Sequence, residues 1–165
     1  MFRLHQVSRR WRLVFLESLA FSCLFSGSAT WMTAGKACLD KLDSAYMMGL
    51  RYATGAFLRS DGQNESNDAV LVMANRICSG SVLRLRRLNL LGRCRRWGPV
   101  QLRVLLDAHT GMKHSWIDTV SDDFDWMCRM LGPKAPPWGW QDLPDVLRSG
   151  GAGWPALLHR TKEAA

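Results

Sequence analysis

One segment of the chain has the residue types and spacing to act on an anionic partner. Residues 76 to 103 contain eight arginines and neither aspartate nor glutamate. A guanidinium group is a planar fork that can hold a phosphate with two hydrogen bonds and can stack on a base. The candidate nucleic-acid-binding residues are those on the helix predicted over residues 82–97: Arg84, Arg86, Arg87, Arg93, Arg95 and Arg96.

These six arginines divide between two neighbouring sides of the predicted helix. One side carries Arg84, Arg87 and Arg95, and the other carries Arg86, Arg93 and Arg96. Leucines are interleaved with them, so the helix can dock by one face and present another. Binding to the backbone of RNA or DNA is the interpretation that this pattern favours.

Two other uses of the arginines stay open. They could pair inside the protein with four acidic residues of a later predicted helix: Asp118, Asp122, Asp123 and Asp125. They could also face an anionic membrane surface, which requires apolar side chains beside the charges. We do not expect a membrane partner, because we predict that the apolar segments pack into a core.

Length and composition set the limits of these interpretations. The chain has 165 residues with 22 basic and 14 acidic side chains, which gives a formal net charge of +8. A basic balance of this size favours an anionic partner. The hydrophobic fraction of 47% is enough for a core and argues against a fully disordered chain. The chain is too short for a complete polymerase or kinase.

Other chemistry finds little support in the residue pattern. Asp122, Asp123 and Asp125 cannot all point one way on a helix, so a solvated face explains them better than a metal site. Five cysteines without C-x-x-C spacing indicate reduced thiols rather than disulfides or zinc ligands. The histidines lack metal-site spacing, and no nucleophile elbow or phosphate loop occurs. We therefore predict no catalytic residue, no metal, no cofactor and no small-molecule substrate.

The elements that position these residues are predicted to be helical throughout. Apolar residues recur at steps of three and four, and no segment shows the period of two that strands require. The predicted helices cover residues 9–25, 34–57, 68–78, 82–97, 99–107 and 115–131. The fold class is thus all-α: a small irregular helical bundle over residues 1–131, followed by a poorly packed, Pro/Gly/Trp-rich tail over residues 132–165.

The first predicted helix has two interpretations. Its apolar residues from Leu13 to Phe25 point nearly all round, which is typical of a buried helix. We expect it to pack on a stripe of the next helix formed by Leu39, Leu42, Tyr46 and Leu50. Alternatively, the preceding arginines and the following small residues 26–29 would form a cleavable signal peptide. The run is shorter than the ~20 apolar residues that a membrane-spanning helix needs.

Four short motifs resemble one known family in order and spacing. Residues 13–31, LVFLESLAFSCLFSGSATW, resemble a helix that runs into a Gly-Ser-x-x-Trp motif. Residues 39–55 are similar to an "L-x-x-L-D … x-L-R-x-x-x-G" helix, and residues 84–93 to an "R-R-L-R-W-L-G-H" helix. Residues 116–124 resemble a "W-x-x-x-V-x-x-D-L" segment. The family is the non-LTR (LINE-type) retrotransposon reverse transcriptases, in the region downstream of the polymerase core.

The resemblance implies a function without catalysis. In that family this region forms thumb-like and linker helices that grip template and primer, whereas the Tyr-x-Asp-Asp strand of the polymerase has no counterpart here. Ala29, Asn89 and Arg93 also replace residues common in the motifs. We therefore expect a non-enzymatic retroelement fragment, cytoplasmic or nuclear, that binds nucleic acid without sequence preference. The alternatives are a secreted or membrane-anchored helical protein and a non-functional translated remnant.

Overall fold

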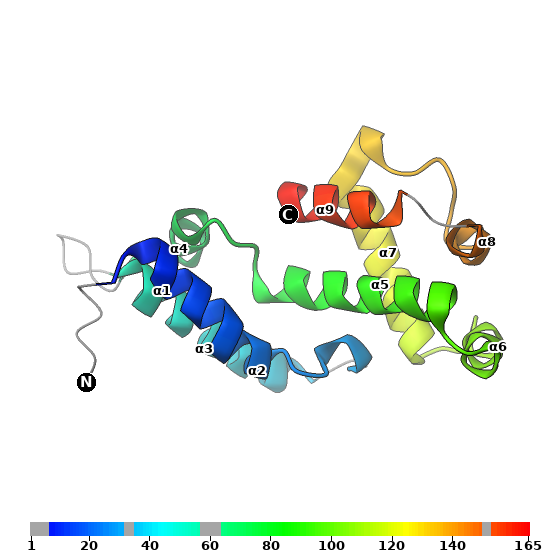
Figure 1. Ribbon diagram of the computed structural model, residues 1–165, viewed down its shortest axis with the longest axis horizontal. Coiled ribbons are helices and arrows are strands. Elements are labelled where there is room, and N and C mark those ends of the chain that lie inside the picture. Colours follow the sequence, from blue (N-terminus) through cyan, green and yellow to red (C-terminus); the bar gives the residue numbers. More distant parts are fainter. Residues whose placement is uncertain (1–6, 32–34, 57–63, 150–152) are drawn as a thin grey trace. The chain divides into compact units, whose positions relative to one another are not determined.

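The computed structural model describes residues 7–31, 35–56, 64–149 and 153–165 (Figure 1). Every regular element in these ranges is a helix, which confirms the predicted all-α fold class. The chain forms two compact units, one of residues 1–26 and 35–80 and the other of residues 27–34 and 81–165. No helix within the described ranges combines the length and apolarity needed to cross a bilayer.

The first unit contains three helical stretches. Its first helix is continuous through α1 (Arg9–Phe15), the π-helical η2 (Leu16–Phe21) and α2 (Ser22–Leu24). It lies beside α3 (Lys36–Thr54), and α3 also contacts α4 (Asn67–Ala74). The helix predicted over residues 68–78 ends early, because Asn75 adopts a left-handed conformation with φ of 51°.

The core of the first unit forms around Tyr46 of α3. Its ring lies 4.6 Å from that of Phe21 and 5.6 Å from that of Phe25, measured between centroids. Its hydroxyl donates a hydrogen bond of 2.8 Å to the carbonyl of Ile77. A Cβ on Gly49 would lie 3.0 Å from the side chain of Leu16, so glycine permits the close approach of α3 to the first helix.

The structure corrects the prediction that the first helix is buried all round. Of its residues from Leu13 to Phe25, only Phe21 and Phe25 are buried. Phe15 and Leu19 are exposed because the described residues of the unit cover only one side of the helix. The stripe on α3 is buried as predicted except for Leu39, which is exposed at the start of the helix.

The second unit is built mainly from the second half of the chain. It comprises η3 (Ser28–Thr30), most of α5 (Ser79–Trp97), α6 (Val100–Ala108), α7 (Trp116–Leu131), η4 (Gly132–Lys134), α8 (Leu143–Arg148) and α9 (Trp154–Ala164). In Figure 1, α7 crosses α5, and α9 packs against α7. The Ser115 hydroxyl caps α7 by accepting from the Asp118 amide at 3.1 Å, as the capping-box pattern predicts.

The core of the second unit draws on all of its longer helices. The apolar residues that recur at steps of three and four along α7 are all buried: Ile117, Val120, Phe124, Met127 and Leu131. Residues 132–165, expected as a poorly packed tail, instead add Leu143, Leu147, Trp154 and Leu157 to the same core. Trp138 also stacks on Phe124, with centroids 5.8 Å apart. The tryptophan-rich segment is therefore better packed than its proline and glycine content indicates.

Candidate nucleic-acid interface

The candidate interface lies on α5, the helix that carries all six predicted arginines. α5 ends at Trp97, where the Gly98 amide donates to the Cys94 carbonyl at 2.9 Å and Pro99 prevents continuation. The six arginines differ in their contacts and in the side of the helix on which they lie. Three of them turn toward carboxylates inside the second unit, and the other three lie on a different side of the helix.

Arg87 and Arg84 share one buried carboxylate on α7. Arg87 donates from Nε and Nη2 to the two oxygens of Asp123, at 2.6 and 2.9 Å. Arg84 lies 3.5 Å from Asp123 Oδ1, and its guanidinium stands over the ring of Trp126 at 5.5 Å from the centroid. The Asp123 side chain is only 2% exposed, so these two cations compensate a charge that water cannot reach.

Arg95 is held by a different acidic residue. It is buried, and its Nη1 donates to Asp107 Oδ1 of α6 at 2.5 Å. Arg148 of α8 lies 4.0 Å from the other oxygen of Asp107. Internal pairing thus occurs for Arg84, Arg87 and Arg95. Asp123 is one of the partners that the sequence suggested, whereas Asp107 is not.

Of the four acidic partners that the sequence suggested, Asp123 pairs with Arg84 and Arg87, and the structure gives the other three different surroundings. Asp118 accepts a hydrogen bond from the His114 amide at 2.9 Å, which helps to fix the start of α7. Asp122 and Asp125 are exposed on α7, as a solvated helix face requires. Asp123 was one of the four suggested partners, but the sequence pattern does not show that it is the buried one.

Arg86, Arg93 and Arg96 form the other side of α5, which we call the outer arginine face. Arg86 and Arg93 are exposed, and Arg96 is half-buried. The Arg96 guanidinium lies over the exposed ring of Trp97, 5.4 Å from its centroid. The face extends about 15 Å along the helix axis from residue 86 to residue 96. That length is sufficient to meet several phosphates of one strand, which rise ~3.4 Å per nucleotide.

The described residues offer little to other kinds of site. Within the described ranges, no group of three or more His, Cys, Asp or Glu side chains is placed to hold a metal ion. The five cysteines all lie in the described ranges, and none of them is in a disulfide. Burial raises the pKa of Cys94 above its ordinary value despite the opposing charges of Arg93 and Arg95. This thiol on α5 is accordingly a poor nucleophile at neutral pH.

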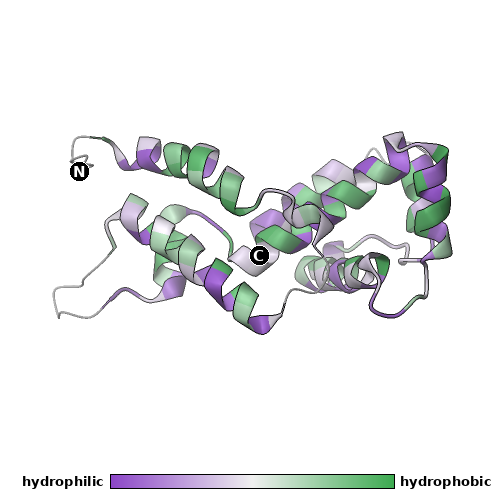
Figure 2. Ribbon diagram, turned by 90° about the horizontal axis from the view of Figure 1, so that it is seen from below, coloured by the Kyte–Doolittle hydropathy of each residue, from purple (hydrophilic) through white to green (hydrophobic). Residues whose placement is uncertain are grey.

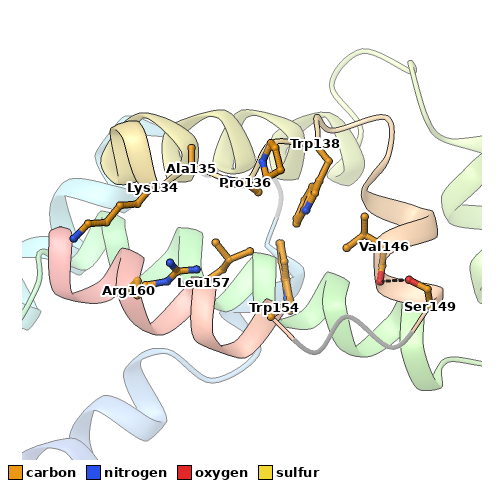
Figure 3. A pocket seen from close by; sticks show the side chains of 11 residues that line it. Lys134, Ala135, Pro136, Trp138, Val146, Ser149, Trp154, Leu157 and Arg160 are labelled. Carbon is orange, nitrogen blue, oxygen red and sulfur yellow. Dashed lines mark hydrogen bonds between the residues drawn. The ribbon is translucent and has the colours of Figure 1, made fainter.

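The structure adds a groove that sequence reasoning missed. It opens between the segment after α7, α8 and α9, with a volume of about 490 Å³ (Figure 3). Lys134 and Arg160 lie toward one end, and Trp138 and Val146 toward the other. The tryptophans of the tail were the available signal, but their convergence depends on how α8 and α9 pack.

Comparison with known proteins does not identify a family or a function for the chain. No protein-family model matches the chain, and neither a curated protein nor a solved structure is significantly similar to it. The likeness to non-LTR reverse transcriptases therefore rests on the four sequence motifs alone and remains a prediction.

Proposed function

We propose that this chain is a non-catalytic fragment of a retroelement reverse transcriptase that binds the backbone of RNA or DNA through the outer arginine face. The motifs in residues 13–124 support the origin, and the surface of α5 supports the activity. The proposed partner is a nucleic acid in the cytoplasm or nucleus. The proposal includes no small-molecule substrate, cofactor or chemical step.

One observation carries the proposal: the six arginines lie on two sides of α5, and the side with Arg86 and Arg93 is exposed. Arg84, Arg87 and Arg95 have carboxylate partners within the second unit. Arg86, Arg93 and Arg96 lie on the other side, with Arg93 exposed in a helix that contains no acidic residue. The proposed contact set is therefore narrower than the six residues that the sequence predicts.

The expected binding mode is contact with phosphate rather than with base edges. Sequence-specific recognition requires side chains that reach base edges in a groove, whereas a short row of arginines neutralises phosphates of any sequence. The second unit carries thirteen basic against eight acidic residues, so its field also favours a polyanion. Trp97, exposed beside Arg96, is available for stacking on an unpaired base.

The test compares two variants that remove the same charge from the second unit. The first replaces the outer arginine face with Arg86→Gln, Arg93→Gln and Arg96→Gln. The matched control carries Lys113→Gln, Arg129→Gln and Lys162→Gln, all at exposed positions away from α5. Fluorescence anisotropy with labelled single-stranded and duplex oligonucleotides at low salt measures the affinity of each protein.

We expect the first variant to lose at least about tenfold in affinity for both oligonucleotides, because three charge-assisted contacts disappear. The control should lose clearly less. Equal losses would mean that net charge, rather than this face, attracts the nucleic acid. No binding by the unmodified protein would favour a non-functional remnant or a secreted or membrane-anchored protein instead.

A further inference from the structure

The first helix of the first unit, residues 9–24, has a second apolar side that the described part of the unit does not cover. We call this side the outer apolar face and define it by Trp11, Val14, Phe15 and Leu19. Trp11 is 58% exposed, Phe15 53% and Leu19 67%. The rings of Trp11 and Phe15 lie 6.1 Å apart, so they form one continuous patch. Figure 2 shows the hydrophobic residues that continue along this helix after its hydrophilic start.

The polar groups within this face are satisfied inside the helix itself. The Ser18 hydroxyl donates to the Val14 carbonyl at 2.8 Å, and the Ser22 hydroxyl donates to the Ser18 carbonyl at 2.7 Å. Neither hydroxyl needs water as an acceptor, which lowers the cost of moving the face out of water. Glu17 is the only acidic residue of the helix and forms an ion pair of 2.7 Å with Arg76.

The charges at the start of the helix indicate what kind of surface would cover the apolar face. Arg9 and Arg10 are exposed within one turn of Trp11. Exposed arginines beside tryptophan, phenylalanine and leucine are the combination that places a helix in the headgroup region of an anionic bilayer. At 1.5 Å per residue the helix is about 24 Å long, shorter than the ~30 Å hydrocarbon core, so it would lie along the surface rather than span it.

We propose that the outer apolar face binds to an anionic lipid surface, with Trp11, Phe15 and Leu19 in the acyl boundary and Arg9 and Arg10 at the phosphate groups. This site lies on a different helix and in a different unit from the outer arginine face. It also departs from the expectation that a membrane is not a partner, because that expectation assumed a first helix buried on all sides.

The experiment is flotation of the full chain with vesicles of phosphatidylcholine and phosphatidylglycerol in equal parts, compared with vesicles of phosphatidylcholine alone. One variant carries Trp11→Ser, Phe15→Ser and Leu19→Ser, which preserves every charge. The matched control carries Met48→Ser, Val72→Ser and Met73→Ser, which are exposed apolar residues of α3 and α4 in the same unit. Circular dichroism checks that both variants keep their helices.

We expect the unmodified protein to bind the anionic vesicles, and the first variant to bind them at least about tenfold more weakly. The control and the Arg86, Arg93 and Arg96 variant should retain binding. Failure of the unmodified protein to float with anionic vesicles overturns the proposal. So does equal binding by the first variant, or a stable dimer that the first variant dissociates, because a second copy would then cover the face.

Discussion

The buried carboxylate of Asp123 accepts two hydrogen bonds from one guanidinium, that of Arg87, where α7 crosses α5. This bidentate contact lies on the same side of α5 as the buried Leu88 and Leu91, which is the side that faces inward. Arg84 and Arg87 are thereby committed to structure, and Arg86 and Arg93 are left on the exposed side.

Asp123→Asn should destabilise the second unit strongly. The substitution leaves Arg87 and Arg84 without their carboxylate, and loss of one partner of a buried ion pair costs about 3–5 kcal/mol. Asp122→Asn, at an exposed position one residue earlier, should change stability by no more than about 0.5 kcal/mol. Urea unfolding followed by circular dichroism measures both. Equal midpoints for the two variants would contradict the structural role of the Asp123 pair.

Gly92→Ala should also destabilise the second unit, because Gly92 touches the indole of Trp154. A Cβ at this position would meet the Nε1 and Cδ1 atoms of that buried ring far inside van der Waals contact. Overpacking of this kind costs about 1–3 kcal/mol. Gly80→Ala is the matched control within α5, because a Cβ there meets nothing within 4 Å. Thermal unfolding should place the Gly80 variant at or above the unmodified protein and the Gly92 variant below it.

Tyr46 predicts how the first unit responds to alkaline pH. Burial, aided by the nearby carboxylates of Glu17 and Asp43, raises the pKa of Tyr46 to about 12. An unfolded tyrosine ionises near pH 10, so the folded state retains a proton that the unfolded state has released. The contribution of Tyr46 to stability should therefore be constant below pH 10 and fall by about 2–3 kcal/mol between pH 10 and 12.

Other groups titrate in the same range, so the Tyr46 contribution is isolated with Tyr46→Phe. This variant loses the hydrogen bond to Ile77, worth about 1 kcal/mol at neutral pH. Its deficit relative to the unmodified protein should shrink as the pH rises from 10 to 12. A deficit that stays constant over this range would show that Tyr46 ionises at its ordinary pKa in the folded state.

Features that depend on a few neighbouring residues could be predicted from the sequence. Ser115 and Asp118 form a cap over three positions, and Gly98 and Pro99 stop α5 where their backbone properties require. The buried stripe of α7 follows from helical periodicity alone. Each of these signals is local, so the rest of the fold does not alter it.

Features that depend on distant partners could not be predicted. The sequence shows four aspartates between residues 118 and 125, and only the crossing of α5 and α7 selects Asp123 for burial. In the same way, the apolar sequence of the first helix predicts burial, but it does not show whether other helices pack on one side or on all sides. Leu19 is exposed because the first unit lacks a further helix to cover it among its described residues. The structure was therefore needed to narrow the candidate binding residues on α5 from six arginines to three.

The most direct test of the central proposal is the salt dependence of oligonucleotide binding by the unmodified protein. Three phosphate contacts through Arg86, Arg93 and Arg96 predict a slope of about −2 to −3 in log K against log salt concentration, equal for unrelated sequences. The variant with glutamine at these three positions should bring the slope close to zero. A flat response in the unmodified protein, or the same slope in the variant, would contradict binding through the outer arginine face.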